Sequence, residues 1–312
     1  MKKLFILMIV ALMATVNVKA QQIAVVAEDG TTTLFRTLDE AIPKALSGSV
    51  IYLPGGGFPV SDETVITKKL TIIGIGYRVK GENVDGYTSI TGNLFFNEGS
   101  SGSALIGCKV TGNVKIGMDK KAVNDVLVRF CNTGTIQVGS NCLGTIINQN
   151  YCSSNFYGTS GEVTNNIIAT VSNLSGGIIA NNIIYGTYQC QGSTNCSITD
   201  NIILEDGVYY GNDNQFSGNM VISSGWGKDE EKIQLESFEG VFVNNKGGNS
   251  LVSNFHFTEG FKQYEGKVGI YAGTSFDDKA LPPVPYIVSK DIAEKTDAEG
   301  KLKIDIRVKA SE

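Results

Sequence analysis

The sequence predicts an all-β protein built as a parallel β-helix, and three observations support this fold class. An asparagine recurs about once every eighteen residues through the middle of the chain. Each lies between short runs of β-branched residues that alternate with small polar ones, which is the pattern of strands. The chain also contains 37 glycines and only 6 prolines, a composition that fits closely spaced turns between continuous strands.

The asparagine period defines the repeating unit. Asparagine tolerates the left-handed backbone angles of a sharp bend, and stacked asparagine side chains can bond to one another as a ladder. A self-similar period of this length is typical of a solenoid. The residues assigned to the seams between coils are Asn93, Asn113, Asn132, Asn150, Asn166, Asn182, Asn201, Asn219 and Asn245.

Residues 1–20 are predicted to be a secretory signal peptide. Two lysines precede an apolar run from Leu4 to Val16, which is too short to span a membrane, and small residues lead to a cleavage point before Gln21. No later stretch approaches the length of a membrane span. We therefore expect an exported protein.

The segments that follow form the entry to the solenoid. Two short strands are expected at 23–26 and 31–35, before a helix at 37–46 that has one apolar face. Thr37 can cap this helix, and Glu40 three residues later completes a capping box. Because a solenoid needs a cover over the open end of its core, we expect the helix to be the N-terminal cap.

The order of these entry segments resembles a known superfamily. Residues 38–42, 50–55 and 70–74 are similar to the entry of the pectate-lyase-like right-handed β-helix superfamily, and the asparagine seam is similar to the ladder of that fold. The resemblance covers roughly residues 35 to 250 and implies a right-handed coil. It implies no single activity, because the superfamily includes lyases, hydrolases, adhesins and binding proteins.

The rhythm breaks after Asn219. The 26 residues to Asn245 include an inserted loop at 223–232 that carries the only tryptophan, and insertions in solenoids often emerge on the working face. Residues 255–271 are expected to form the last coil or its cap. We therefore assign residues 21–272 to the β-helix.

The remaining residues, 273–312, are assigned to a linker and a β appendage. Residues 281–285 are rich in proline and stiff, and residues 301–309 alternate charged with apolar side chains, as in a half-buried strand. The segment 268–309 resembles C-terminal tails that follow β-helices in exported proteins of Gram-negative bacteria. That resemblance implies a periplasmic, cell-surface or extracellular location.

Composition narrows the classes of partner. The net charge is −5 and no basic run occurs, which argues against nucleic acid as a ligand. In an exported protein the six cysteines could form disulfides. Cys190 and Cys196 bracket a polar loop that a disulfide would close, whereas small apolar packing is the interpretation for the other four. We expect a monomer.

Candidates for catalysis are few. A lyase that acts on uronic-acid polymers needs a basic residue and a cation, and Arg129 on a strand is the candidate base, with ordinary surface charge as the alternative. His256, the only histidine, is interpreted as a packed or edge residue. Nucleophile motifs are absent from the sequence. No cofactor is expected, although calcium remains an alternative with oxygen ligands from Glu205, Asp206 and Asp213.

Aromatic residues give the stronger binding signal. Counted from each seam asparagine, several fall at similar positions and could form a column along one side of the coils. Flat rings in such a column suit the apolar faces of sugars, but rings stacked in the core are the alternative. The candidate ligand-binding residues are Tyr157, Tyr188, Tyr209, Tyr210 and Trp226.

These patterns favour an extracytoplasmic protein that recognises a polysaccharide along the coil surface. A polysaccharide lyase that uses Arg129 with calcium is the enzymatic alternative. A purely structural or adhesive surface protein is the third class. Acidic residues gathered around Arg129 would favour the lyase, and exposed rings without them would favour binding.

Overall fold

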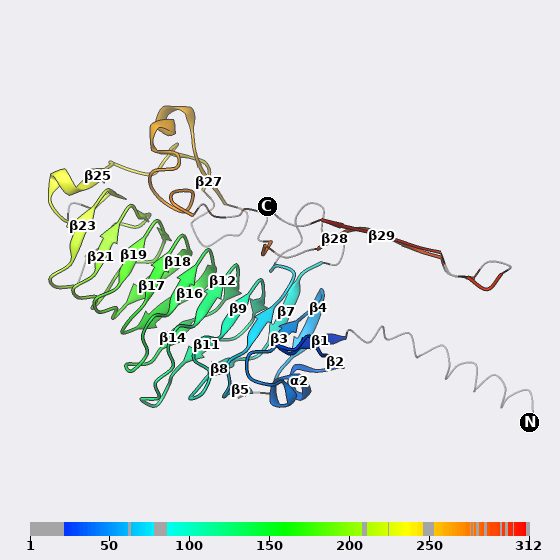
Figure 1. The fold of residues 1–312 in the computed structure, drawn as a ribbon. Coiled ribbons are helices and arrows are strands. Elements are labelled where there is room, and N and C mark those ends of the chain that lie inside the picture. The colour runs from blue at the N-terminus through cyan, green and yellow to red at the C-terminus, as the bar shows by residue number, and fades with distance from the viewer. Residues whose placement is uncertain are drawn as a thin grey trace, which may run out of the picture.

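A computed structural model describes residues 22–61, 64–77, 86–207, 211–223, 225–245, 253–274, 276, 278, 281–283, 286–293, 295–296, 299–301 and 303–309. The predicted all-β fold is confirmed: the chain forms a parallel β-solenoid of about 8 turns (Figure 1). The predicted signal peptide, residues 1–20, and two of the candidate binding residues, Tyr209 and Tyr210, lie outside the described residues.

The first sheet has eleven strands, and it is parallel from β3 onward. Its first three strands pair antiparallel, so the sheet opens with a turned-back hairpin at the N-terminal end. In spatial order the strands are β2 (Thr32–Phe35), β1 (Ile23–Val26), β3 (Val50–Tyr52), β6 (Thr71–Ile73), β9 (Ala104–Ile106), β12 (Leu127–Arg129), β15 (Ile146–Asn148), β17 (Glu162–Thr164), β19 (Ile178–Ala180), β21 (Ser197–Thr199) and β23 (Gln215–Ser217).

The second sheet has fourteen strands in two runs that join at the long strand β16. The main run is β25 (Lys232–Gln234), β24 (Asn219–Val221), β22 (Ile202–Ile203), β20 (Ile183–Ile184), β18 (Ile167–Ser172), β16 (Tyr151–Gly158), β13 (Asn132–Thr133), β10 (Lys109–Val110), β7 (Thr88–Thr91) and β4 (Gly56–Pro59). The side run is β5 (Thr64–Ile66), β8 (Leu94–Phe96), β11 (Val114–Ile116) and β14 (Ile136–Val138).

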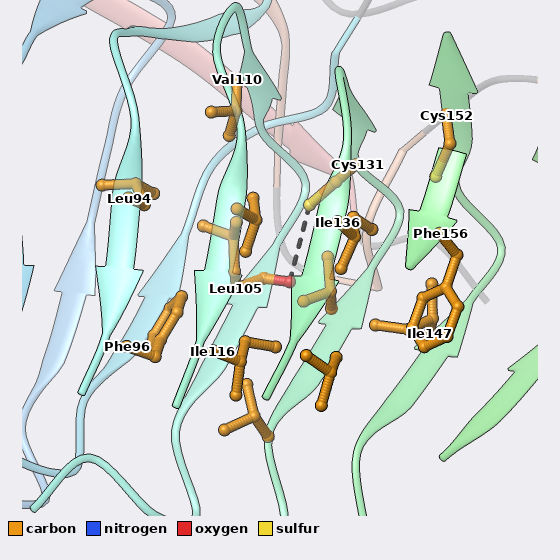
Figure 2. Close-up of a cluster of buried hydrophobic side chains, with 14 of the residues drawn as sticks. Leu94, Phe96, Leu105, Val110, Ile116, Cys131, Ile136, Ile147, Cys152 and Phe156 are labelled. Carbon is orange, nitrogen blue, oxygen red and sulfur yellow. Dashed lines mark hydrogen bonds between the residues drawn. The ribbon is translucent and has the colours of Figure 1, made fainter. Parts of the chain in front are cut away.

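Alternation along each short strand fills the core. From β3 to β21, the central residue of each first-sheet strand points inward, and these residues stack in register from coil to coil. They are Ile51, Ile72, Leu105, Val128, Ile147, Val163, Ile179 and Ile198, all fully buried. Side chains from the second sheet, such as Phe96, Ile116 and Phe156, meet them from the opposite side (Figure 2).

The N-terminal end of this core is covered by helix α2 (Leu38–Lys44), close to the predicted range. The Glu40 backbone N–H donates to the Thr37 side chain at 3.2 Å, which is the predicted N-cap. Leu38, Ala41 and Ile42 are buried in the same cluster as the coil interior. The helix therefore closes the solenoid at this end.

An asparagine ladder runs inside the bend between the two sheets. From Asn150 to Asn201, each side-chain amide donates to the side-chain oxygen of the next ladder asparagine at 2.9–3.1 Å. Each also donates to a backbone carbonyl of an earlier coil at 2.7–2.9 Å. The predicted ladder is confirmed for five buried residues, which are Asn150, Asn166, Asn182, Asn201 and Asn219.

The ladder does not include Asn132, which the sequence assigned to it. The backbone N–H of Cys131 donates to Asn150 Oδ1 at 2.9 Å, so Cys131 occupies the ladder position and Asn132 lies one residue beyond it. The left-handed backbone belongs to the residue before each ladder position, as at Gln149 (φ 56°) and Asn165 (φ 55°). The left-handed bend and the ladder side chain are therefore supplied by two adjacent residues, not by the same residue.

The two earliest seam asparagines belong to a different bend. Asn113 N–H donates to Asn93 Oδ1 at 2.8 Å, and Thr135 N–H donates to Asn113 Oδ1 at 3.1 Å. These residues form a second, shorter ladder at the entry to the side run of the second sheet. Asn245 follows β26 (Phe242–Asn244), which pairs antiparallel with β27 (Asn254–Phe257), so it lies outside the coils.

The outer face of the second sheet carries an apolar stripe where a solvated face is expected. We call it the outer stripe, and its in-register members are Tyr151, Ile167, Ile183, Ile202 and Met220. All five are buried in a second hydrophobic cluster, separate from the coil interior. On the preceding coils the same register position holds the polar residues Asn132, Lys109 and Ser89. An added layer must therefore cover the C-terminal half of this face.

That layer is formed by the described residues of segment 238–276, which we call the C-terminal cover. It contains the β26–β27 hairpin and the short helix η2 (Glu259–Tyr264). Phe242, Phe255, Phe257 and Ile270 are buried in the same cluster as the outer stripe. The sequence-based expectation that residues 255–271 form the last coil or its cap is therefore replaced by a lateral cover.

The end of the cover is a strap, residues 268–274, that runs back along the bends. Gly269 N–H donates to the Asp200 carbonyl at 2.7 Å, and the Asn165 side chain donates to the Ala272 carbonyl at 2.6 Å. Gln149 Nε2 donates to the Thr274 carbonyl. Residues at the left-handed positions, two through their side chains and Asp200 through its carbonyl, thus fasten the strap to successive coils.

The inserted loop closes the C-terminal end of the solenoid. It contains the short helix η1 (Asp229–Glu231), and Trp226 in this loop is 1% exposed. The indole meets Phe216 of the last first-sheet strand edge-on, with ring centroids 6.0 Å apart. Trp226 belongs to the coil-interior cluster, so the loop functions as the second end cap.

The C-terminal appendage is a two-stranded antiparallel hairpin of β28 (Tyr286–Ile292) and β29 (Ile304–Lys309). All six residues of β29 are exposed, so the expected half-buried strand is wrong. In Figure 1 the hairpin lies apart from the coils, which explains why neither face of β29 is covered.

Candidate functional site

The best candidate surface lies on the outward positions of the side run. We call it the outer strip; it is a different surface from the buried outer stripe of the main run. Its members are Phe95, Lys115, Gln137 and Tyr157, each opposite the next in register. In every one of these strands the flanking residues are buried, which directs the central side chain outward. Coils repeat about every 4.8 Å, so the strip extends roughly 14 Å along the solenoid axis.

The strip combines ring faces with hydrogen-bonding groups. Tyr157 is 53% exposed, and the Lys115 ammonium lies 4.6 Å from the centroid of the Phe95 ring. On β10 of the main run, the Lys109 ammonium lies 5.9 Å from the centroid of Tyr87. The Gln137 side chain, between Lys115 and Tyr157 in the strip, offers an amide donor and an acceptor. The strip strands contain no Asp or Glu.

The predicted aromatic column is present only in part. Tyr157 has Gln137 on the coil before and Ser172 on the coil after, so no second ring stacks on it in register. Tyr188 is 61% exposed but lies outside any strand, in the bend after β20. Neither tyrosine is buried, so the core-stacking alternative does not apply to them.

For Trp226, the core-stacking alternative holds. Its buried position in the end cap leaves no ring face for a ligand, so its assignment to a glycan-facing column is wrong. Sequence reasoning overlooked Phe95, Lys115 and Gln137. The available signal was the buried–exposed–buried pattern of three-residue strands one coil apart, which places their centres in one outward row.

In the described part of the chain, the Arg129 side chain is held by neighbouring side chains and not by acids. Its guanidinium donates to Gln149 Oε1 at 3.2 Å and lies 4.6 Å from the centroid of the Phe130 ring. Partial burial lowers the pKa of Arg129 from its ordinary value. Within the described residues, no carboxylate forms an ion pair with this side chain. The acidic surroundings that a lyase base would need are not assembled there.

Metal ligands do not converge in the part of the chain that the structure describes. No group of three or more His, Cys, Asp or Glu there could hold a metal ion, so Glu205, Asp206 and Asp213 do not form the calcium site considered from the sequence. Cys190 and Cys196 are both buried free thiols. Burial is the larger cause that raises the pKa of the Cys190 thiol, and the neighbouring thiol of Cys196 raises it further.

Neither a family model, nor a curated protein, nor a solved structure matches this chain. No helix among the described residues is long and apolar enough to cross a membrane. The function must therefore be inferred from the surface that the coils present.

Proposed function

We propose that this protein recognises a polysaccharide along the outer strip without cleaving it. The observation that carries the proposal is the in-register row of Phe95, Lys115, Gln137 and Tyr157, one side chain per coil. A polysaccharide is also a repeating linear molecule, so equivalent groups at a fixed rise can engage successive sugars. Exposed ring faces suit the apolar faces of sugars, and the amide and ammonium groups suit their hydroxyl and carboxyl groups.

Two further features support this proposal. Arg129 is held by Gln149 and Phe130 and is not placed among acids, which favours binding over elimination chemistry. The parallel solenoid, the entry motifs and the asparagine ladder support membership of the pectate-lyase-like superfamily. With the signal-like residues 1–20, we infer an exported monomer at the periplasm, cell surface or exterior of a Gram-negative bacterium.

The test is retention on a panel of immobilised polysaccharides, with absorbance from unsaturated products followed in parallel. We expect retention by at least one glycan and no absorbance change. Tyr157→Ala should weaken retention about tenfold, because loss of a stacked ring typically removes roughly 1 to 1.5 kcal/mol. Tyr188→Ala is the matched control, since it removes a similarly exposed ring outside the strip.

Each outcome is diagnostic. Loss of retention in Tyr188→Ala but not in Tyr157→Ala would refute the outer strip as the site. Unsaturated products would establish the lyase, and Arg129→Lys would then be the variant to test. Absence of both retention and cleavage across the panel would refute recognition and leave a structural or adhesive surface protein.

A further inference from the structure

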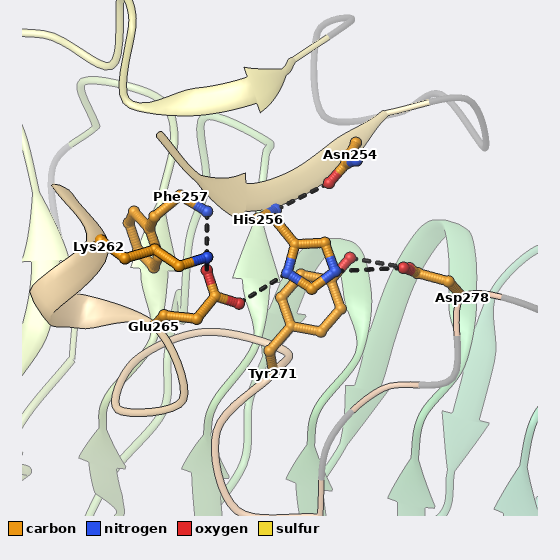
Figure 3. A network of polar contacts seen from close by, with 7 residues as sticks. All are labelled: Asn254, His256, Phe257, Lys262, Glu265, Tyr271 and Asp278. Atoms are coloured by element: carbon orange, nitrogen blue, oxygen red, sulfur yellow. Dashed lines mark hydrogen bonds and ion pairs between the residues drawn. The ribbon is translucent and has the colours of Figure 1, made fainter. Parts of the chain in front are cut away.

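The only histidine of the chain lies between two carboxylates on the C-terminal cover. His256 Nδ1 is 2.7 Å from Glu265 Oε1, and His256 Nε2 is 3.4 Å from Asp278 Oδ2 (Figure 3). The imidazole also stacks parallel on the Tyr271 ring, with centroids 3.9 Å apart and an interplanar angle of 4°. The sequence-based interpretation as a packed or edge residue does not anticipate these partners.

Only the protonated form of the His256 ring satisfies both carboxylate contacts. A neutral imidazole has a single N–H, so it can donate to Glu265 or to Asp278 but not to both. An imidazolium donates from both nitrogens, and its positive charge is favoured by the parallel ring of Tyr271. In the neutral state, one ring nitrogen would present a lone pair to a carboxylate oxygen, which is repulsive.

The Glu265 side of the contact is the better fixed. Glu265 Oε2 accepts the Phe257 backbone N–H at 3.0 Å, and the Lys262 ammonium is 3.6 Å away. Burial opposes the charged form of Glu265, but the bonds from His256 and the Phe257 N–H, with the charges of His256 and Lys262, outweigh it and lower its pKa. Glu265 therefore remains an ionised acceptor that retains one N–H of the ring.

The Asp278 side is the one that can be released. Asp278 has an additional bond, because the Tyr271 hydroxyl donates to its Oδ1 at 2.8 Å. Its separation from His256 Nε2 is the longer of the two contacts, and its side chain is 41% exposed. When the ring keeps its single N–H on Glu265, the contact to Asp278 is lost first.

We propose that His256 is a proton-operated latch on the C-terminal cover. When protonated, it joins β27, the residue after η2, the strap and Asp278 into one unit. When neutral, it keeps Glu265 and releases Asp278, which precedes the β28–β29 hairpin in the chain. Among the described residues, the charged groups that face it are Glu265 and Asp278, and Lys262 forms an ion pair with the other oxygen of Glu265.

The direction of the pH response follows from these groups. The contact requires a ring that donates from both nitrogens and an ionised Asp278, so it opens when the ring loses its proton. Imidazole is the side chain that normally changes charge between about pH 5 and 8. The outer stripe stays covered throughout, because apolar burial and not this contact holds Phe255 and Ile270 in place.

The test uses the full chain and its single imidazole. The ring signals in a proton NMR titration belong to one residue, so they report its protonation without assignment. Hydrogen exchange, corrected for the intrinsic rate, is measured at pH 5.5 and pH 8 for the peptide containing Phe276, whose N–H donates to the Ile270 carbonyl at 2.8 Å. We expect exchange to be about two- to fivefold faster at pH 8, the factor that a partly exposed ion pair supports.

Two variants and one internal control make the result decisive. In His256→Gln and Asp278→Asn the pH dependence of this peptide should disappear, and Asp278→Asn should shift the titration of the ring to lower pH. Peptides that contain the buried ladder residue Asn182 should not respond to pH in any variant. The latch is refuted if His256→Gln keeps the wild-type pH response, or if the ring titration is indifferent to Asp278→Asn.

Discussion

Replacing Asn182 by alanine should be far more costly than its small change in volume suggests. The side chain is fully buried in the middle of the asparagine ladder. Its Oδ1 accepts the backbone N–H and the Nδ2 of Asn166 at 2.9 and 3.1 Å. Its Nδ2 donates to the Val163 carbonyl at 2.8 Å and to Asn201 Oδ1 at 2.9 Å.

The magnitude follows from these four bonds. Alanine leaves the Asn166 N–H without its acceptor in a place that water does not reach, and an unsatisfied buried group costs about 1–3 kcal/mol. The bonds to Val163, to Asn201 and from Asn166 Nδ2 contribute about 0.5–1.5 kcal/mol each when lost. We expect the free energy of unfolding to fall by about 3–5 kcal/mol.

Asn113→Ala is the matched control. Asn113 lies in the shorter ladder, is only partly buried, and its side chain accepts one bond, from the Thr135 N–H at 3.1 Å. We expect a loss of about 1 kcal/mol there. Urea unfolding followed by circular dichroism measures both variants. Equal losses for Asn182→Ala and Asn113→Ala would refute the reasoning that stacked, water-free bonds make the inner ladder dominant.

Four further predictions follow from burial and charge. Trp226→Ala should lower the free energy of unfolding by about 3–5 kcal/mol, because it opens the end of the core, whereas Tyr157→Ala should stay within about 0.5 kcal/mol in the same urea experiment. Burial raises the pKa of Asp200 above 3.8, so its contribution to stability is present below that pH and lost as pH rises through the raised value; Asp200→Asn should therefore be more stable than wild type at pH 7 but not at pH 3. Glu265 has the opposite sign, since its lowered pKa gives stability above pH 4.5 that is lost on acidification through the lowered value; Glu265→Gln should flatten the acid side of a melting-temperature profile. Burial raises the pKa of Cys131 to about 12, so its thiol should react with a disulfide reagent only after unfolding in urea.

The solenoid could be predicted because its signal is local and repeated. Each bend requires a residue that accepts left-handed angles, and each coil repeats that demand. The exact register of the coils was harder to predict, because Cys131 occupies one ladder position and Asn132 is the next residue in the chain. A shift of one residue turns a strand position from the interior to the surface, so the asparagine count alone could not place it.

The cover was missed although the sequence contains a signal for it. Strands with one solvated face alternate, whereas the doublets at 167–168, 183–184 and 202–203 are apolar on both faces. Such doublets are typical of strands buried on two sides. They predict a second layer over three consecutive coils, which is what the C-terminal cover provides.

The end cap and the histidine latch are harder to predict. A tryptophan in an insertion near the end of the repeats fits a ligand site and an end cap equally well, and only the direction of the ring separates them. His256, Glu265 and Asp278 belong to a non-repeating segment, so no period relates them. Their meeting depends on the path of the strap, which tertiary packing decides.

The outer stripe has a consequence for how the molecule is made. A chain synthesised from its N-terminus presents Tyr151, Ile167 and Ile183 before residues 238–276 exist to cover them. During that interval a row of apolar side chains faces solvent on coils that can already stack. A chaperone that binds this row would protect the nascent chain from aggregation until the C-terminal cover has folded over it.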